Sequence, residues 1–357
     1  MPRQLSLIDL TDYHGRKDEI AQQLLHAASD AGFFWITGHG ISQEEIQQQS
    51  SNGDKFLGLS DAQKDFATFR PELFMGWRGL RDTQAAVGTS SWEQYLVAFN
   101  DSYMQGIWPL EQDLPGFKAS ALEFARKANA VALQILSCFE QALNLPEGYF
   151  QHHLEPEAED NRTLFGWNYY PDPHKSKPRS DQLRLLPHAD TDVITLLFQK
   201  PGEPGLEILP GKDAEQHAVN DPSGKDSYGL NGAWTGGIPQ GKWTKMDPIP
   251  GAITVNIGNM LMRLSDNKLK STYHRVRALE EGEVSGARRS MVLFVHGRGS
   301  AIMQGPQKAY PAQTVAEMIA MNGRGYEKVK ADKEWQQLVM KAQPHDHGSE
   351  PPLIAVA

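Results

Sequence analysis

The sequence predicts an α+β protein whose core is a double-stranded β-helix, or jelly roll, braced by helices from its N-terminal part. Residues 164–295 carry short apolar or alternating runs separated by Gly, Pro, Asn and Asp, which is typical of strands joined by turns. The first 150 residues instead carry apolar residues mostly at helical spacing. We therefore expect a mainly helical region over residues 1–150 that packs on the barrel. A jelly-roll core with C-terminal helices should follow over residues 151–343, and residues 344–357 should form a disordered tail.

The N-terminal region is expected to contain two helices that pack near a strand. Residues 18–28 carry apolar side chains at helical spacing, and Gly32 is expected to end that helix. A strand over Phe33–Thr37 follows. A long helix is predicted over Phe117–Leu143, because its apolar residues form one broad face. We expect this long helix to brace the sheet.

Three predicted strands of the barrel matter most for function. Residues 193–198 form a β-branched and apolar run that is typical of a buried strand. Residues 269–277 and 287–296 alternate between polar and apolar side chains, as half-buried strands do. The Asp266–Asn267 pair is typical of a hairpin turn.

The strand over residues 287–296 is expected to direct a charged group into the barrel. Residues two apart on a strand share a face, so Arg288 and Ser290 should point together and Arg289 the other way. A guanidinium and a hydroxyl directed into an apolar barrel are costly without a partner, and an anionic carboxylate is the natural one. Phe294 lies on the same face, where it either lines a substrate pocket or belongs to the core.

A candidate metal site combines His188 and Asp190 with His274 further along the chain. A His-x-Asp pair and a distant His form the ligand set of a 2-His-1-carboxylate facial triad, which holds Fe(II) and leaves positions open for other ligands. The tripeptide alone is common by chance. The tripeptide is more informative here because a predicted buried strand directly follows it. His39 and His296 are expected to be structural, although His296 shares the inward face of its strand.

Composition limits the possible function classes. A 357-residue chain with 39% hydrophobic residues can form one large barrel with helical additions. The net charge is −9 and no Lys/Arg-dense run occurs, so nucleic acid is not an expected partner. The one cysteine, Cys138, cannot form an internal disulfide and is expected in the core. No apolar run is long enough for a signal peptide or a membrane span, so we expect a cytoplasmic protein.

Residues 210–241 form a stretch of about 30 loop-type residues between two predicted strands. One interpretation is a tolerated surface excursion. The other is a flap over the mouth of the barrel, with Tyr228, Leu230 and Trp234 as apolar contacts to substrate. The sequence leaves both open.

Four blocks of the sequence resemble the isopenicillin N synthase-like family of Fe(II)- and 2-oxoglutarate-dependent oxygenases. They occur in the order and spacing of that family: Leu7–Leu10 with Ala31–Ile41; Asn168–Pro171 ahead of His188–Asp190; Gly258–Val276; and Arg288 with Ser290. Asn259 departs from the family, which usually has Asp after the Gly, but it lies outside the ligand set.

This resemblance implies both the site and the reaction. The implied iron ligands are His188, Asp190 and His274, and the implied 2-oxoglutarate contacts are Arg288, Ser290, Asn168 and Tyr170. Phe294 and Trp234 are candidates for the substrate pocket. The implied enzyme is a dioxygenase that uses O2 and 2-oxoglutarate to oxidise a C–H bond of a small organic substrate, of the secondary-metabolite type, and releases succinate and CO2. Ascorbate is an optional reductant in vitro.

Two other functions stay open at this point. One is an Fe(II) oxidase of the same fold that does not use 2-oxoglutarate, since family oxidases use the Arg-x-Ser pair to hold other anions. The second is a catalytically silent metal- or ligand-binding protein. The sequence does not identify the substrate, the outcome of the oxidation or the oligomeric state.

Overall fold

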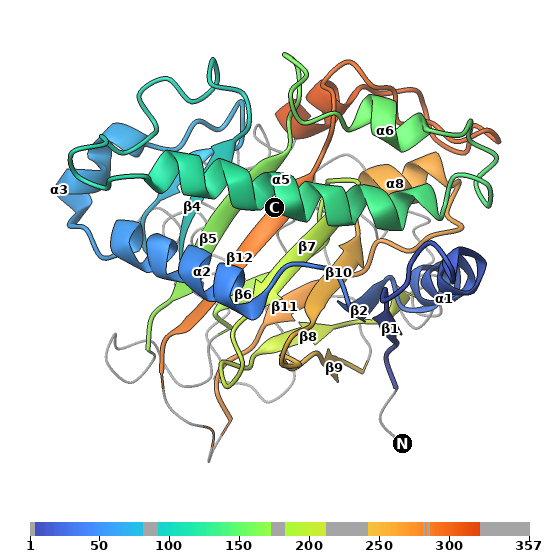
Figure 1. The fold of residues 1–357 in the computed structure, drawn as a ribbon, viewed down its shortest axis with the longest axis horizontal. Coiled ribbons are helices and arrows are strands. Elements are labelled where there is room, and N and C mark those ends of the chain that lie inside the picture. Colours follow the sequence, from blue (N-terminus) through green and yellow to red (C-terminus); the bar gives the residue numbers. More distant parts are fainter. Residues whose placement is uncertain are drawn as a thin grey trace, which may run out of the picture.

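Two β-sheets form the centre of the molecule in a computed structural model that describes residues 4–80, 92–172, 183–211, 242–280, 283 and 286–321 (Figure 1). Within these residues the larger sheet has eight strands, in the spatial order β1 (Leu7–Asp9), β2 (Phe33–Thr37), β10 (Ile253–Ile257), β7 (Ile194–Gln199), β12 (Arg288–Val295), β5 (Leu164–Tyr170), β4 (Glu93–Ala98) and β3 (Gly76–Arg78). The described part of the smaller sheet has the order β6 (Leu185–His188), β11 (His274–Val276), β8 (Leu206–Ile208) and β9 (Thr244–Lys245). This arrangement of helices and two sheets confirms the predicted α+β jelly-roll class.

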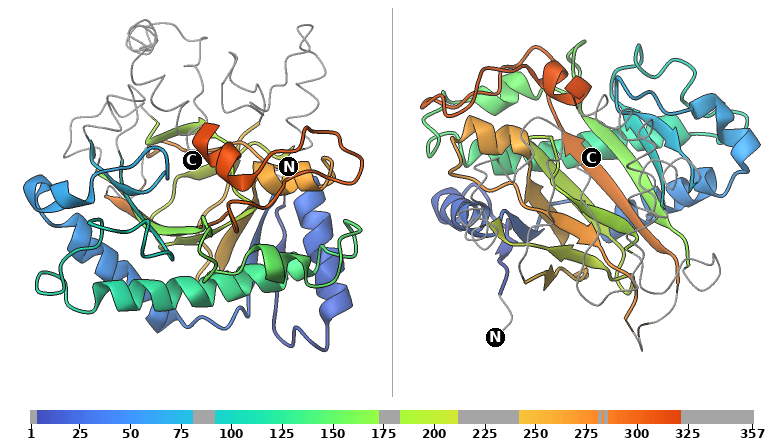
Figure 2. Two further views of the ribbon diagram at one scale, coloured as in Figure 1. Left: turned by 90° about the horizontal axis from the view of Figure 1, so that it is seen from above. Right: turned by 180° about the vertical axis from the view of Figure 1, so that it is seen from behind.

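Helices cover one face of the larger sheet. The described helices are α1 (Lys17–Asp30), α2 (Gln43–Leu57), α3 (Asp61–Lys64), the 3-10 turn η1 (Asp65–Ala67), α5 (Phe117–Ser137), α6 (Tyr149–His153) and α8 (Asn259–Leu264). Helix α5 crosses in front of the sheet and contacts β12 and β7, and α2 lies beside it and contacts β5 (Figure 1). Seen from above, α5 runs along one side of the sheet (Figure 2, left). The predicted bracing role of this helix is confirmed.

The N-terminal part of the chain also contributes strands to both edges of the larger sheet. Strands β1 and β2 form one edge, and β4 and β3 form the other. Between them lie β10, β7, β12 and β5, which all follow residue 163 in the chain. The N-terminal residues therefore complete the sheet as well as covering it.

Helix α5 starts at the predicted residue but ends six residues before the predicted Leu143, at Ser137. The Cys138 and Phe139 amides donate to the carbonyls of Ile135 and Leu136, three residues back, so the last turn tightens and the helix stops. Cys138 itself is buried, as predicted.

Gly32 makes the sharp turn from α1 into β2. Its φ of +71° favours glycine, and a Cβ here would lie 2.1 Å from the Lys270 carbonyl oxygen. The segment before β11 is tied to this turn, because the Lys270 amide donates to the Ala28 carbonyl and the Thr272 hydroxyl donates to the Ala31 carbonyl. These bonds replace sheet pairing, which is why β11 is shorter than the strand predicted over residues 269–277.

Asp266 and Asn267 form a turn, with φ values of 47° and 65°, but the predicted hairpin is wrong. The turn follows helix α8 rather than a strand. The Asp266 carboxylate accepts the backbone amides of Gln307 (2.7 Å) and Ala309 (3.0 Å), so it anchors a distant loop. The Asp-Asn pair therefore predicts a turn, but it does not show whether the turn joins two strands or follows a helix.

Some sequence-based predictions concern residues outside the described part. These are the tail over 344–357 and, within the 210–241 stretch, residues 212–241 with Tyr228, Leu230 and Trp234. Among the described helices, none has the length and apolar character needed to cross a membrane.

A buried ion pair fastens β4 to the helices. The Lys64 ammonium lies 2.6 Å from a Glu93 carboxylate oxygen, which also accepts the Trp77 indole N–H at 2.6 Å. Lys64 and Glu93 are 2% and 6% exposed. Strand alternation turns Glu93 and Trp77 to this side of the sheet, so their neighbours Gln94 and Arg78 face the other side.

We predict that Lys64→Met destabilises the protein by about 3–5 kcal/mol, because it leaves the Glu93 carboxylate buried without its counter-charge. Urea unfolding followed by circular dichroism measures this loss. The matched control is Lys118→Met, which breaks the exposed pair with Asp101 and should cost no more than about 1 kcal/mol. Equal losses in the two variants would contradict the role of the buried pair.

Candidate active site

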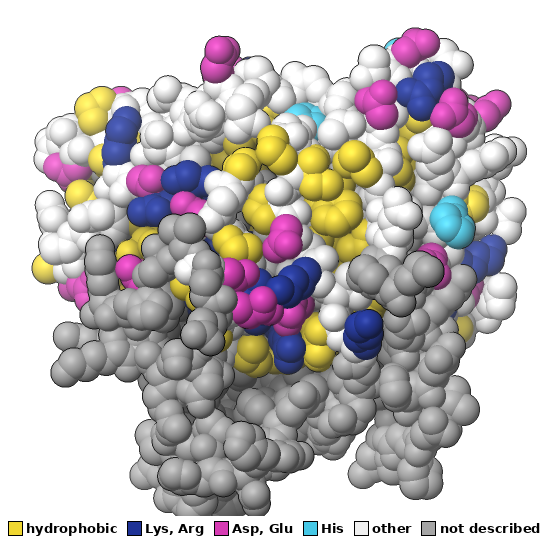
Figure 3. Space-filling view, turned by 90° about the horizontal axis from the view of Figure 1, so that it is seen from below, with side chains coloured by type: hydrophobic (Ala, Val, Ile, Leu, Met, Phe, Trp, Pro, Cys, Tyr) yellow, Lys and Arg dark blue, Asp and Glu magenta, His cyan; other side chains and the backbone are white. Residues whose placement is uncertain are grey.

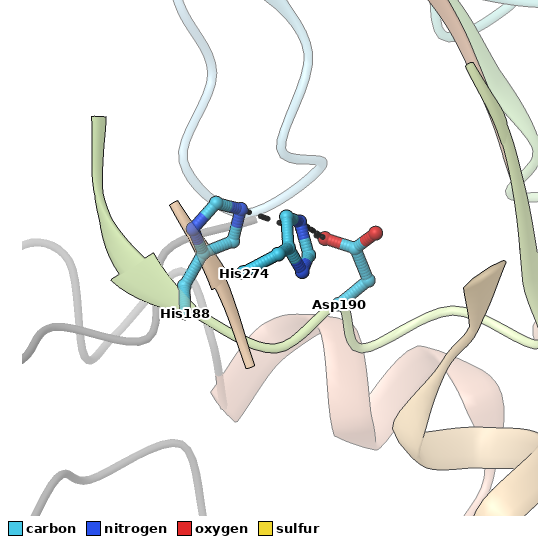
Figure 4. A group of neighbouring side chains, drawn as sticks. All are labelled: His188, Asp190 and His274. Carbon is cyan, nitrogen blue, oxygen red and sulfur yellow. Dashed lines mark ion pairs between the residues drawn. The ribbon is translucent and has the colours of Figure 1, made fainter. Parts of the chain in front are cut away.

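The three candidate metal ligands meet at one end of the cavity that lies between the two sheets (Figure 4). His188 ends β6 and His274 begins β11, and these two residues are direct partners in the antiparallel pairing of the strands. Asp190 follows β6 by two residues. One potential ligand atom from each residue lies within 4.8 Å of the others, and all three residues are buried. The fold therefore joins residues that are far apart in sequence.

The Asp190 carboxylate is held by one oxygen and leaves the other for a ligand. Its Oδ2 accepts the Thr195 hydroxyl at 2.6 Å and the Asn256 side-chain amide at 2.8 Å. Its Oδ1 is buried without a hydrogen bond and lies 3.7 Å from His188 Nε2 and 3.6 Å from His274 Nε2. Figure 4 shows both imidazole rings directed toward this oxygen.

This arrangement fits a divalent first-row metal. A buried carboxylate oxygen without a donor is costly, and a cation bound between it and two imidazole nitrogens removes that cost. The two-imidazole, one-carboxylate donor set suits Fe(II). The His274 Nδ1 lies 3.2 Å from the Thr272 carbonyl, and a hydrogen bond there leaves Nε2 as the nitrogen that can bind a metal.

The charge state of the site follows from its neighbours. Burial by itself raises the pKa of Asp190, but His274, His188 and the two hydrogen bonds outweigh it, so the pKa lies below its ordinary value. Burial, and next the charge of Asp190, raise the pKa of Asp192 well above its ordinary value. Asp192 Oδ2 accepts the same Thr195 hydroxyl at 2.8 Å.

A buried arginine lies in the same cavity. Arg288 is 2% exposed, its Nη2 donates to Gln199 Oε1 at 3.0 Å, and its Nε has no hydrogen-bond partner. Its guanidinium carbon lies 5.0 Å from the centre of the Tyr170 ring. Burial lowers the pKa of Arg288, while Tyr170 and Glu203 oppose this effect. A buried cation with an unused donor fits a carboxylate of a bound molecule.

Strand alternation on β12 is as predicted. Arg288, Ser290 and Phe294 all line the cavity. Arg289 points away from it and pairs with Asp54 at 2.8 Å on the helix-covered side. The prediction that Arg288 and Ser290 share a face and that Arg289 does not is confirmed.

Asn168 and Tyr170 also line the cavity, on β5 next to β12. Asn168 Nδ2 lies 3.5 Å from Ser290 Oγ, and Asn168 Oδ1 accepts the Gln94 side-chain amide at 2.8 Å. The sequence did not point to Gln94 or to Gln199. The only signal for them is their cross-strand register with Asn168 and Ser290, which becomes visible once the strands are paired.

Two other histidines singled out in the sequence do not line the cavity. His39 bonds to the Gly251 carbonyl and accepts the Ile41 amide, which is a structural role. His296 is buried behind Phe294, and burial lowers its pKa to about 4, so it is neutral. Apolar lining comes instead from both sheets, through Phe33, Leu197, Leu206 and Val276.

The surface beneath the smaller sheet carries mixed charge. Arg275 pairs with Glu207 at 2.8 Å, and Lys245 with Glu280 at 2.6 Å. Seen from below, Lys or Arg side chains lie next to Asp or Glu side chains on this face (Figure 3).

Two family models match the chain. The N-terminal model of the non-haem dioxygenase in morphine synthesis matches residues 5–108, and the model of the 2OG-Fe(II) oxygenase superfamily matches residues 227–297. The second segment includes His274, Arg288 and Ser290.

Relatives and a solved structure agree with these matches. Proline hydroxylase buaE of Petromyces alliaceus is 28% identical over 295 residues, which cover 78% of this chain and 82% of that protein. The 2-oxoglutarate-Fe(II) type oxidoreductase hxnY of Emericella nidulans is 24% identical over 368 residues, covering 95% of each. The crystal structure of a full-length Neurospora crassa protein in complex with α-ketoglutarate and thymine has a TM-score of 0.71 at 21% identity. It covers 90% of this chain and 96% of that chain, and it shows the same fold.

The family models match two separate segments of the chain, and the relatives extend along most of it. Together they show that this chain is similar to Fe(II)/2-oxoglutarate-dependent oxygenases along most of its length.

Proposed function

We propose that His188, Asp190 and His274 hold Fe(II) and that the cavity between the sheets is the active site of a 2-oxoglutarate-dependent dioxygenase. One observation carries this proposal: the buried Asp190 Oδ1 has no hydrogen bond and faces two imidazole nitrogens. The three residues supply neutral and anionic donors to one side of the cation, which suits a metal that must also bind other ligands.

Arg288 and Ser290 are proposed to bind the distal carboxylate of 2-oxoglutarate, with Asn168 and Tyr170 beside them. Arg288 offers a guanidinium with an unused Nε donor. Ser290 offers a hydroxyl from the same strand face, and Gln199 holds the guanidinium from the neighbouring strand. A charge-assisted bond in this buried place favours a dianionic cosubstrate over a neutral one.

The iron, when bound with 2-oxoglutarate and O2, supplies the oxidising power for attack on a substrate C–H bond, with release of succinate and CO2. The chain contributes position and shielding. Apolar side chains such as Phe33, Leu206 and Phe294 line the cavity and keep water away from the reacting groups. Thr195 and Asn256 fix the orientation of the Asp190 carboxylate, so its Oδ1 stays directed at the histidines.

The substrate is proposed to be a small organic molecule. Apolar side chains and convergent buried polar groups together line the cavity, and such a combination is found in small-ligand sites. The relatives and the solved structure name different ligands, proline for one and thymine for another, so likeness alone does not identify the substrate. A cytoplasmic location and the absence of a nucleic-acid partner stay predictions.

The test of function is consumption of 2-oxoglutarate. Purified protein with Fe(II), ascorbate and 2-oxoglutarate should form succinate. When compounds of a metabolite library are added, succinate should form faster with those that are substrates. Mass spectrometry of the same reactions identifies the oxidised product. Product without succinate would favour the oxidase that does not use 2-oxoglutarate, and neither signal would favour a silent binding protein.

We predict that His274→Ala abolishes tight binding of a divalent metal and all succinate formation, because one of three ligands is removed. The variant should still fold, since the two sheets are held by many other contacts. Isothermal titration with Fe(II) under anaerobic conditions and circular dichroism measure the two effects. His39→Ala is the control and should retain metal. Turnover by the His274 variant would refute the ligand set.

We predict that Arg288→Ala raises the concentration of 2-oxoglutarate needed for half-maximal succinate formation by about a hundredfold or more. Loss of one partner of a buried charge pair costs about 3–5 kcal/mol. Arg289→Ala should change this concentration only a few-fold, since Arg289 pairs on the opposite face. A larger effect of Arg289 would mean that the register of β12 is wrong by one residue.

A further inference from the structure

We propose that Gln199 is a positioning residue that sets the length of the dicarboxylate that the cavity accepts. It does so by fixing the distance between the proposed iron ligands and Arg288. This inference rests on the proposed function of the cavity and adds to it the feature that selects the cosubstrate by its length.

The pairing of β7 with β12 places the Gln199 side chain beside the proposed cosubstrate site. Gln199 ends β7, and its direct partner in this antiparallel pairing is Ser290. Direct cross-strand partners present their side chains on the same face of a sheet. Ser290 lines the cavity, so the Gln199 side chain lies on the cavity face. Gln199 is 9% exposed, and its amide therefore needs partners inside the protein.

Three hydrogen bonds hold the amide of Gln199 in one orientation. Its Nε2 donates to the Met246 carbonyl at 3.2 Å and to Thr254 Oγ1 at 3.0 Å. A carbonyl oxygen can only accept, so the amide nitrogen must face Met246 and the amide oxygen must face away from it. This oxygen, Oε1, accepts Arg288 Nη2 at 3.0 Å. The group that holds the guanidinium is therefore itself held on its other side.

Gln199 also connects the larger sheet to the strands of the smaller sheet that carry the histidine ligands. Met246 directly follows β9, and its amide donates to the Leu206 carbonyl at 2.9 Å. Leu206 lies on β8 and is the direct partner of Val276 on β11, the strand that His274 begins. A path of hydrogen bonds and strand pairing therefore runs from the guanidinium through Gln199 to a proposed iron ligand.

This path determines which dicarboxylate fits. The proposed function places the 2-oxo acid end of the cosubstrate at the iron and its distal carboxylate at Arg288. When both ends are held, a dicarboxylate of matching length binds without moving either of them, whereas a longer one must bend or displace the guanidinium. Without Gln199 the guanidinium can move, and the longer acid should then be accepted more readily.

The neutral amide of Gln199 holds the guanidinium without itself compensating its charge. A carboxylate at the same position would form an ion pair with Arg288 and compete with the distal carboxylate of the cosubstrate. Gln199→Glu replaces the amide nitrogen by an oxygen of similar size, so it changes charge with little change in shape. This substitution therefore separates the effect of charge from that of packing.

The experiment measures the binding of three 2-oxo acids to anaerobic, Fe(II)-loaded protein by isothermal titration calorimetry. They are 2-oxoglutarate, 2-oxoadipate, which is one methylene group longer, and 2-oxopentanoate, which lacks the distal carboxylate. We expect the wild-type protein to bind 2-oxoglutarate about tenfold or more tightly than either of the others, because only 2-oxoglutarate brings a carboxylate to Arg288 without strain.

The two Gln199 variants should differ in their effects. Gln199→Leu should lower the preference for 2-oxoglutarate over 2-oxoadipate to about threefold or less, because the guanidinium is no longer held. Gln199→Glu should weaken binding of 2-oxoglutarate about tenfold or more, because the new carboxylate occupies Arg288. Both variants should bind 2-oxopentanoate within about threefold of wild type, because this acid makes no bond to Arg288.

Gln313→Glu is the matched control. Gln313 Oε1 also accepts a hydrogen bond from a buried arginine, Arg263, but neither residue lines the cavity. This variant should bind all three acids within about twofold of wild type. Circular dichroism compares the fold of each variant with that of the wild-type protein.

The role of Gln199 is overturned if wild type binds the two diacids equally well, or if Gln199→Leu keeps the wild-type preference between them. Unchanged affinity of Gln199→Glu for 2-oxoglutarate also overturns it. So does an equal loss of 2-oxopentanoate and 2-oxoglutarate binding in the variants, which would show a general disturbance of the site. These results leave the proposed function intact, whereas failure of wild type with Fe(II) to bind 2-oxoglutarate would defeat the proposed function and this inference together.

Discussion

The site depends on the buried carboxylate of Asp190, of which Oδ2 is hydrogen-bonded and Oδ1 is not. A buried charge is tolerated only where its surroundings compensate it. Thr195 on β7 and Asn256 on β10 compensate one oxygen from the larger sheet, and the two histidines of the smaller sheet face the other. The carboxylate therefore lies where the two sheets meet, and a cation bound there would connect them. The position of the proposed metal site therefore follows from the place where the two sheets meet.

The larger sheet carries the remaining chemistry in one row across its strands. Because residues in register lie side by side, Arg78, Gln94, Asn168, Ser290 and Gln199 follow one another over five neighbouring strands. Each contributes a polar group to the same face of the sheet, and hydrogen bonds connect several of them. A sheet orders such a row more rigidly than loops do, because backbone pairing with neighbouring strands limits how far each side chain can move.

The sequence alone predicted the parts of this site that local patterns determine. The His-x-Asp motif and the alternation around Arg288 need only neighbouring residues, so His188, Asp190, Arg288 and Ser290 could be chosen before any pairing was known. Arg78 ends a strand of three residues, which is too short to show a period. Its relation to Ser290 depends on the register of three strand pairs, which no single stretch of sequence contains. The early end of α5 also could not be predicted, because it depends on the backbone hydrogen bonds of the last turn.

Arg288 and Arg78 both line the cavity, but they lie on strands that differ in how many neighbouring elements a substitution would disturb. Arg288 starts β12, which pairs with β5 on one side and β7 on the other, and helix α5 covers that strand. Arg78 ends β3, which is the edge of the sheet and pairs with β4 alone. A substitution on β12 disturbs two strands and a helix, whereas one on β3 disturbs fewer neighbours. The sheet thus places Arg288, the proposed cosubstrate contact, near its centre and Arg78 at its edge. A change at the edge position is therefore expected to disturb the residues proposed to hold iron and 2-oxoglutarate less than a change on β12 would.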